Sequence, residues 1–234
     1  MTHNSKKKGF TLLELLIVIA IIAILSVIII FVLNPAETLR KARDTQRMSD
    51  LNTLKTALGL YLTSTTTIDL DGGVGANFTC LNGSAADAEI AYSVDLANQA
   101  CSGNPVEGGD TGATFISDYC YSLTAASGSG NVDGTGWVPV NMAGLIGGSP
   151  ISNFPLDPTN SLASSTQPTS TDYVYRYACQ STGAAGKPSR VFELGAVLES
   201  EAFTLEDNRM AKDGGDSTSY YEVGTSLKLM TSGY

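Results

Sequence analysis

The sequence predicts an α+β protein in which a long N-terminal helix, membrane-spanning in its first half, packs on a small antiparallel sheet in a globular head. Three observations predict it. An uncharged apolar run covers residues 15–33, and leucines recur at helical spacing over residues 51–62. Residues 173–179 and 191–199 each show the two-residue alternation of strands.

Composition excludes several functions. The chain has 234 residues with 14 Lys and Arg against 23 Asp and Glu, and residues 56–175 carry eleven acids without a base. Such a stretch cannot neutralise a phosphate backbone, so we expect no nucleic acid binding by the head. The single histidine, His3, lies in a short basic leader, which leaves no imidazole elsewhere for a Ser-His-Asp triad or a histidine-ligated metal.

The apolar run at residues 15–33 is long enough to cross a membrane. Ser26 is its only polar residue, and a helix of this length, at about 1.5 Å per residue, spans roughly 28 Å, close to the ~30 Å core of a bilayer. A lone strand would leave its backbone unpaired in lipid, so a helix is predicted despite many β-branched residues. Bases stand on both sides of the run, so their count gives no orientation.

The residues before this run do not follow the order of an ordinary signal peptide. A lysine cluster, residues 6–8, ends at Gly9, and no small-residue cleavage site follows the apolar run. Glu14 lies at the edge of the run, where a carboxylate is costly without a partner. It is either a functional residue or a glutamate at the level of the lipid headgroups.

These residues carry a family resemblance. The segment Lys7-Lys8-Gly9-Phe10-Thr11-Leu12-Leu13-Glu14, followed by the apolar run, resembles the class III leader of type IV pilins and type II secretion pseudopilins. The resemblance implies that a prepilin peptidase, acting also as N-methyltransferase, cuts after Gly9 and methylates Phe10. It implies that Glu14 pairs with the N-terminal amine of a neighbouring subunit during assembly. Cleavage would place that cation one helical turn from Glu14.

The resemblance also implies an organisation for the whole chain. Its parts would be a cleaved basic leader (1–9), a transmembrane and assembly helix (10–35), an amphipathic continuation (36–63) and an extracytoplasmic globular head (64–234). The chain would be a non-enzymatic structural subunit of a type IV pilus-like filament, held in the inner (cytoplasmic) membrane by one span before assembly and displayed at the cell surface afterwards. Its partners would be the prepilin peptidase, other copies of itself, other pilins, the membrane and an assembly platform.

Two alternative functions stay open. One is a pseudopilin of a type II secretion system, which promotes protein secretion. The other, more remote, is a membrane-tethered extracytoplasmic enzyme or binding module, for which acids such as Asp157 and Asp172 could form a glycosidase pair.

Asn34-Pro35 predicts an interruption of the helix, because proline lacks an N–H and crowds the preceding turn. Beyond it, the leucine spacing predicts an amphipathic helix to about residue 63. A basic patch at residues 40–47 fits either a solvated helix face or a contact with an acidic partner in the filament.

The head contains few periodic signals before residue 171, so long loops are predicted there. The clearest strands start at Tyr173 and Val191, and residues 119–124 and 137–142 are further candidates. The tyrosines at residues 173–177 are interpreted as one face of a sheet. The segment Phe154-Pro155-Leu156-Asp157-Pro158-Thr159 is similar to a proline-aspartate-proline segment of major pseudopilins and related pilins.

The cysteines predict two disulfides in an oxidising compartment, because they are four in number, lack the CxxC spacing of zinc sites and follow the membrane span. They are Cys80, Cys101, Cys120 and Cys179. Three pairings are open. We favour Cys80 with Cys101, which closes a loop, and Cys120 with Cys179, which joins two strand candidates.

Calcium is the one cofactor that the sequence raises. Asp213 and Asp216 flank two glycines, which places hard oxygen ligands on a flexible turn. Major pseudopilins bind calcium in a C-terminal loop, so the resemblance favours this interpretation. The EF-hand pattern is absent, and an ordinary acidic turn is the alternative.

Overall fold

A computed structural model of the chain describes residues 9–72, 80–82, 88–93, 115–118, 130–162, 169, 171–182 and 189–230. The chain divides into two compact units, Met1–Arg40 and Lys41–Tyr234. The predicted strand at residues 119–124, the lysine cluster at residues 6–8, Cys101 and Cys120 lie outside the described residues.

The first unit contains α1 (Leu12–Leu33) and the first residues of α2 (Pro35–Ser64). Asn34 separates the two helices and adopts a left-handed conformation with φ of 35°. Its side-chain Oδ1 accepts a hydrogen bond from the Glu37 N–H at 3.4 Å, so Asn34 both ends α1 and caps α2. Pro35 takes the first helical position of α2, where a missing N–H costs nothing. The predicted interruption is therefore present.

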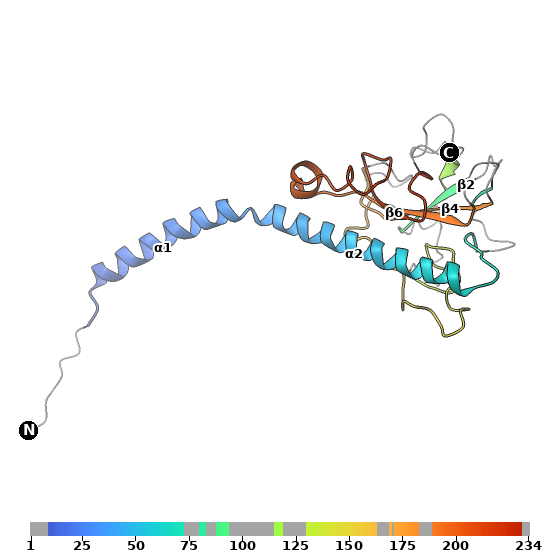
Figure 1. The fold of residues 1–234 in the computed structure, drawn as a ribbon. Helices are drawn as coiled ribbons and strands as arrows, with labels where there is room; N and C mark the ends of the chain where they lie inside the picture. Colours follow the sequence, from blue (N-terminus) through green and yellow to red (C-terminus); the bar gives the residue numbers. More distant parts are fainter. Residues whose placement is uncertain are drawn as a thin grey trace, which may run out of the picture. The chain divides into compact units, whose positions relative to one another are not determined.

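In the second unit, α2 buries one face against the head (Figure 1). The buried apolar side chains recur every three or four residues, as the amphipathic pattern predicts, and they are Leu51, Leu54, Ala57, Leu58 and Tyr61. The helix ends at Ser64, one residue beyond the predicted end. Tyr61 fixes the following turn, because its hydroxyl donates to the Asp69 carbonyl at 2.9 Å and accepts from the Asp69 N–H at 3.1 Å.

The sheet has the strand order β3-β2-β4-β5-β6, and β1 pairs with β4 beside this path. The strands are β1 (Leu81–Asn82), β2 (Ala88–Tyr92), β3 (Phe115–Asp118), β4 (Arg176–Thr182), β5 (Val191–Ala196) and β6 (Tyr221–Gly224). Four of them, β2, β4, β5 and β6, form an antiparallel sheet, whereas the β1·β4 and β2·β3 pairs are parallel. The predicted pilin-like α+β fold, a long N-terminal helix on an antiparallel sheet, is confirmed.

The two faces of the sheet belong to two cores. On the face toward α2, side chains such as Tyr177, Phe192 and Leu194 join the helix leucines and Trp137 in one buried cluster. The opposite face carries a smaller cluster, which includes Tyr92, Val174, Ala178, Leu229 and Met230. The strand predicted from Tyr173 starts later, at Arg176, so only Tyr177 of the tyrosine stripe lies on the sheet. Tyr175, just before the strand, is buried in the same cluster, and Tyr173 is half-buried.

The predicted strand at residues 137–142 is wrong. Residues 132–142 instead form a loop, whose two ends are joined by a hydrogen bond from the Met142 N–H to the Val132 carbonyl at 2.8 Å. Its apolar residues fill the core without joining the main sheet, and Trp137 donates from Nε1 to the Pro155 carbonyl at 3.0 Å. Gly136 permits the loop, since a Cβ there would lie 2.0 Å from the Asn131 carbonyl oxygen.

The strand predicted at residues 191–199 ends earlier, at Ala196. The chain leaves the ladder because the N–H groups of Glu199 and Ser200 donate to the Asp44 carboxylate on α2, at 2.8–3.1 Å. A side chain from the helix thus takes hydrogen bonds that a neighbouring strand would otherwise take. A π-helical turn, η1 (Ala202–Glu206), follows.

The favoured disulfide pairing is also wrong. Cys80 bonds to Cys179, 99 positions later in the sequence. Cys80 directly precedes β1, and the pairing of Leu81 with Gln180 brings the two cysteines side by side. The register of β1 on β4 was not visible in the sequence, and it, rather than loop closure, decides the pairing.

Candidate processing and assembly site

The Gly9–Phe10 junction is open to another molecule. A Cβ built at Gly9 would meet no atom within 4 Å, and Phe10 is 84% exposed. The junction lies just before α1: Phe10 is not helical, and Thr11 is the N-cap of the helix. An exposed, non-helical bond between a glycine and a large apolar residue is geometrically available to a peptidase.

Thr11 and Glu14 form a capping box at the start of α1. The Glu14 N–H donates to the Thr11 hydroxyl at 3.2 Å, and the Thr11 N–H donates to Glu14 Oε2 at 2.9 Å. The Thr11 hydroxyl also donates to Oε2 at 2.9 Å. All three bonds remain possible after a cut between Gly9 and Phe10, because Thr11 stays in the mature chain. Thr11 is a residue whose role the sequence analysis missed, although the Thr-x-x-Glu spacing before an apolar run is a visible signal.

The capping box uses only one of the two oxygens of Glu14. Every hydrogen bond that its carboxylate accepts from Thr11 ends at Oε2. The other oxygen, Oε1, is left for a partner outside the first turn. An N-terminal ammonium group, which cleavage after Gly9 would create, is a charged donor suited to this oxygen.

The rest of α1 has the surface of a membrane helix. The window Leu12–Ile29 has a mean hydropathy of 3.2 and is 0% buried. The Ser26 hydroxyl donates to the Ile22 carbonyl at 2.7 Å, so this polar group has its hydrogen-bond partner within the helix. An unburied apolar helix of this length is unstable in water, so it needs lipid or other helices around it.

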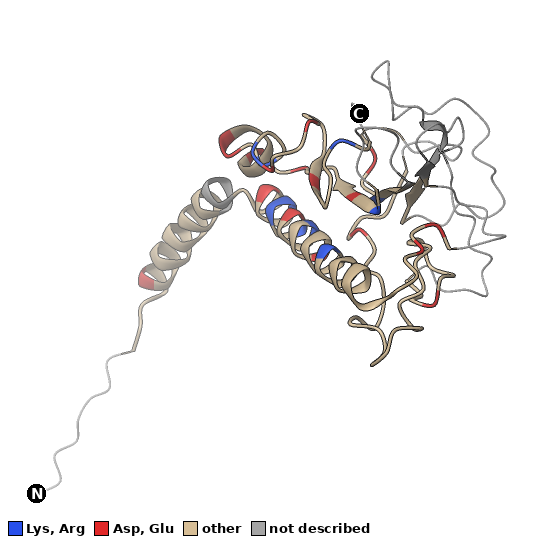
Figure 2. Ribbon diagram, turned by 45° about the vertical axis from the view of Figure 1, so that its right-hand side comes forward, with Lys and Arg blue, Asp and Glu red and all other residues tan. Residues whose placement is uncertain are grey.

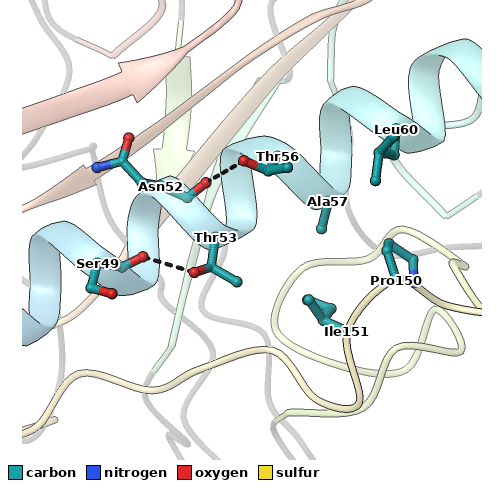
Figure 3. Close-up of a pocket in the computed structure, with 8 residues that line it drawn as sticks. All are labelled: Ser49, Asn52, Thr53, Thr56, Ala57, Leu60, Pro150 and Ile151. Atoms are coloured by element: carbon teal, nitrogen blue, oxygen red, sulfur yellow. Dashed lines mark hydrogen bonds between the residues drawn. The ribbon is translucent and has the colours of Figure 1, made fainter.

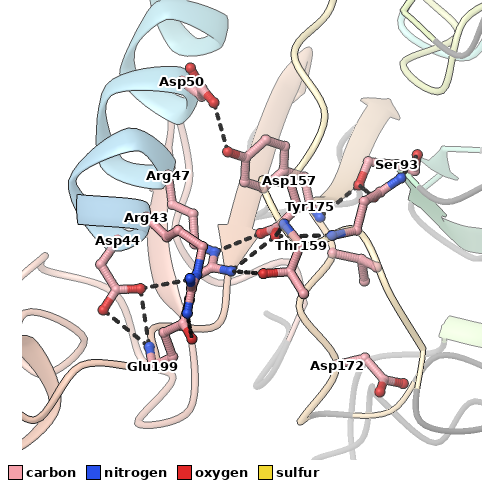
Figure 4. A network of polar contacts seen from close by, with 12 residues as sticks. Arg43, Asp44, Arg47, Asp50, Ser93, Asp157, Thr159, Asp172, Tyr175 and Glu199 are labelled. Carbon is pink, nitrogen blue, oxygen red and sulfur yellow. Dashed lines mark hydrogen bonds and ion pairs between the residues drawn. The ribbon is translucent and has the colours of Figure 1, made fainter. Parts of the chain in front are cut away.

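A buried ion cluster fixes α2 to the head (Figure 4). Its centre is Arg47, which is fully buried and donates to three carboxylates, from Asp44, Asp157 and Glu199, at 2.7–3.0 Å. Arg43 contacts Glu199 through two further bonds, at 2.6 and 2.7 Å. The set is called the Arg47 cluster below and comprises Arg43, Asp44, Arg47, Asp157 and Glu199.

The cluster satisfies Arg47 completely. Its guanidinium makes five hydrogen bonds, the number of its N–H donors, including one to the Thr159 hydroxyl at 3.1 Å. The group also lies over the Tyr173 ring, 4.8 Å from its centroid. Burial lowers the pKa of Arg47, but the surrounding carboxylates outweigh it and raise the pKa above its ordinary value. Arg47 is therefore permanently charged, and its role is to hold three segments together.

The cluster corrects one part of the sequence analysis. The basic patch at residues 40–47 was expected to face solvent or an acidic partner in a filament. Arg40 and Lys41 are exposed, whereas Arg47 is buried, and the acids that it and Arg43 contact come from the same chain. Figure 2 shows the bases concentrated along α2 among acids of the helix and the head. Asp157 of the proline-aspartate-proline segment thus has a structural partner, which spacing alone did not reveal.

The two acids considered for a glycosidase pair are each held by other groups of the head. Asp157 is 4% exposed and bound to Arg47. Asp172 is 3% exposed and accepts hydrogen bonds from the Thr169 N–H and hydroxyl, at 2.7 and 3.0 Å. Both carboxylates therefore serve the packing of loops.

The candidate calcium loop is closed by its own backbone. Asp213 accepts from the Gly215 N–H at 2.9 Å through Oδ1 and from the Glu222 N–H at 2.7 Å through Oδ2. Both oxygens are therefore engaged with N–H groups. Among the described residues, no group of three or more His, Cys, Asp or Glu side chains is arranged to hold a metal ion.

A pocket of about 430 Å³ lies on α2 (Figure 3). It is lined by Ser49, Asn52, Thr53, Thr56, Ala57, Leu60, Pro150 and Ile151. The hydroxyls of Thr53 and Thr56 donate to carbonyls of their own helix, those of Ser49 and Asn52, at 2.9 Å each. None of the eight side chains is an acid or base, so this pocket provides no general acid–base chemistry.

Comparison with known proteins agrees with the N-terminal geometry. Residues 4–30 match the prokaryotic N-terminal methylation motif. No curated protein and no solved structure matches the chain at a significant level. The match covers the junction, the capping box and most of α1, and it implies processing by a prepilin peptidase and anchoring of the chain in a membrane by α1. Over these residues the chain carries the class III prepilin leader and methylation motif of the type IV pilin and pseudopilin family.

Proposed function

We propose that the chain is a structural, non-enzymatic subunit of a type IV pilus-like filament. After cleavage between Gly9 and Phe10 and N-methylation of Phe10, residues 10–35 would hold it in the inner membrane and then polymerise with other copies and other pilins on an assembly platform. The head, residues 64–234, would lie outside the cytoplasm and become part of a surface filament. One observation carries the proposal: the exposed junction, the capping box and the apolar helix follow one another without a gap.

The capping box gives Glu14 a defined role in this assembly. It orients the carboxylate toward the start of α1 and leaves Oε1 for the amine of a neighbouring subunit. In lipid or in a helical filament core, an unpaired carboxylate is costly. An axial position of neighbouring helices that pairs Glu14 with an amine is therefore strongly favoured over positions that leave it unpaired. Charge pairing would thus set the axial spacing, while the uniform apolar surface of α1 supplies non-directional contacts.

The head favours a pilus over a pseudopilus. The head is cross-linked by the Cys80–Cys179 disulfide, and a disulfide is suited to a protein exposed outside the cell. Both oxygens of Asp213 already accept backbone N–H groups, which supports an ordinary acidic turn in the candidate calcium loop. A requirement for calcium in folding, together with a secretion defect on deletion, would instead support the pseudopilin.

The first experiment is intact-mass and N-terminal peptide mass spectrometry on protein from native membranes and from the cell surface. A chain that begins at N-methylated Phe10 supports the proposal. A mature pool that still begins at Met1 contradicts it, because the amine that Glu14 needs is then absent.

The second experiment separates a filament subunit from a plain membrane tether. Glu14→Gln keeps the capping box, because glutamine also fits that position, but removes the charge. We expect filaments to be lost while the head stays folded. Glu206→Gln, which changes an exposed acid of η1, is the matched control and should assemble normally. Normal filaments in the Glu14→Gln variant would favour the tether.

A further inference from the structure

Two carboxyl groups are buried together on the face of the sheet opposite α2. Glu193 on β5 is 0% exposed and Glu222 on β6 is 1% exposed. Glu193 lies opposite Gly224, and Glu222 lies opposite Gly195, so the two side chains are diagonal neighbours on one face. Gly215, in the loop before β6, leaves space for the Glu222 carboxyl, since a Cβ there would lie 1.9 Å from Glu222 Oε2. The two carboxyls are within hydrogen-bonding reach of each other.

Each carboxyl uses one oxygen to hold a backbone segment. Glu193 Oε2 accepts from the N–H groups of Leu229 and Met230, at 2.5 and 3.1 Å. Glu222 Oε2 accepts from the Ser217 N–H at 2.9 Å. The other oxygen, Oε1, of each group is buried without a hydrogen-bond donor. A buried acceptor in this state is costly, and a proton on either carboxyl would provide the missing donor.

The charged groups around the pair do not replace that proton. Asp213 and Asp216, in the loop before β6, add negative charge next to Glu222. Arg176 on β4 shares this face, but its guanidinium donates to the carbonyls of Val174, Thr169 and Asp172 and lies over the Tyr220 ring. Lys228 is exposed. Two ionised carboxylates would therefore repel each other in a buried site.

We propose that Glu193 and Glu222 share one proton, and that loss of this proton releases residues 225–230, the C-terminal strap, from the sheet. The strap ends in Leu229 and Met230, which are 0% and 3% exposed and complete the second core. Its release would uncover Tyr92, Val174 and Ala178 on the outer face of the sheet. The inference concerns the head alone and holds whether the chain forms pili or not.

The direction of the pH dependence follows from the site. Burial raises the pKa of Glu193 well above its ordinary value, and the neighbouring Glu222 raises it further. Burial also raises the pKa of Glu222. Because both folded-state values lie above the ordinary 4.5, the stability that the pair contributes is fully present below pH 4.5. It is lost as pH rises through the folded-state values.

The test is hydrogen exchange of the strap in the full mature chain, held in detergent micelles with EDTA and compared at pH 5 and pH 8. Protection factors, which correct for the intrinsic pH dependence of exchange, should fall for Leu229 and Met230 as pH rises, by about tenfold per pH unit inside the window. Amides of α2, such as Leu54, should not change.

Two variants test whether the pair of carboxyls causes the pH-dependent loss of protection in the strap. Glu222→Gln supplies a permanent donor to Glu193, so the strap should stay protected at pH 8. Glu206→Gln, an exposed acid of η1, is the control and should keep the fall. The proposal is overturned if strap protection in the natural chain is the same at both pH values, or if Glu222→Gln shows the same fall. It is also overturned if protection at pH 5 requires added Ca²⁺, since a metal ion would then neutralise the pair.

Discussion

Arg47 and Asp157 lie 110 positions apart in the sequence and form a two-point ion pair inside the head. Arg47 Nε donates to Asp157 Oδ2 at 2.7 Å, and Nη2 donates to Oδ1 at 3.0 Å. Both side chains are fully buried. The pair joins α2 to the loop that follows Trp137, and Asp44 and Glu199 extend it to the end of β5. The position of the helix on the sheet therefore depends on a compensated charge as well as on leucine packing.

Removing Arg47 should destabilise the head severely. Arg47→Met keeps an apolar stem of similar length but leaves Asp44, Asp157 and Glu199 without their shared cation. Breaking a buried pair from one side typically costs about 3–5 kcal/mol, because an uncompensated charge remains in the interior. We expect a loss of this order in the free energy of unfolding, measured by urea denaturation of the full chain in detergent.

Arg43→Met is the matched control for that measurement. Arg43 contacts Glu199 at the edge of the cluster, and its side chain is 36% exposed, so water can replace the guanidinium. Its loss of stability should be clearly smaller than that of Arg47→Met. Equal losses would mean that the cluster acts through packing rather than through buried charge.

The disulfide should connect Cys80 to Cys179 in the mature protein. Peptide mapping under non-reducing conditions should recover the two cysteines in one cross-linked species. A double Cys80→Ser and Cys179→Ser variant should lose about 2–5 kcal/mol of stability, because the bond closes a loop with a sequence separation of 99. Recovery of Cys80 joined to Cys101 would contradict the structure. We predict that Cys101 and Cys120 form the second bond.

The sequence was most informative where a physical pattern is local. The apolar run, the Asn34-Pro35 break and the leucine spacing of α2 each depend on neighbours within a few residues, and all three are present as predicted. The strands β4 and β5 were visible for the same reason, whereas β6 was not predicted. β4 starts at Arg176 instead of Tyr173, and β5 ends early because Asp44 accepts the hydrogen bonds of the following N–H groups.

The features that sequence reasoning missed depend on distant residues. Arg47 looked like part of a solvated basic face because its main acid lies 110 positions away. The disulfide pairing followed the register of a two-residue strand, which no periodicity marks. Nothing local in the sequence marks Glu193 or Glu222, and only their burial on one face of the sheet makes them unusual.

Thr11 should position Glu14 for assembly. Thr11→Val removes the hydroxyl that caps α1 while keeping the shape of the side chain, so the first turn should fray and Glu14 should lose its orientation. We expect fewer filaments with unchanged cleavage and methylation of Phe10, scored by electron microscopy and mass spectrometry. Thr11→Ser restores the hydroxyl and should restore assembly. If valine and serine assemble equally well, the cap has no part in polymerisation.

Acid should loosen the Arg47 cluster through Glu199. Burial raises the pKa of Glu199, but the guanidinium groups of Arg43 and Arg47 outweigh it and hold the pKa below its ordinary value. A lowered folded-state pKa means that the stabilisation is present above about pH 4.5 and is lost as pH falls through the folded-state value. This is opposite in sign to the pair formed by Glu193 and Glu222.

The acid response of Glu199 and the response of the Glu193 and Glu222 pair at higher pH can be separated with the variant Glu199→Gln. Glu199→Gln cannot ionise, so its stability, followed by thermal unfolding between pH 3 and pH 6, should depend less on pH below 4.5 than that of the natural chain. Its strap should still lose protection at high pH, because Glu193 and Glu222 are unchanged. An undiminished acid response in Glu199→Gln would show that protonation elsewhere governs the acid limit of the head.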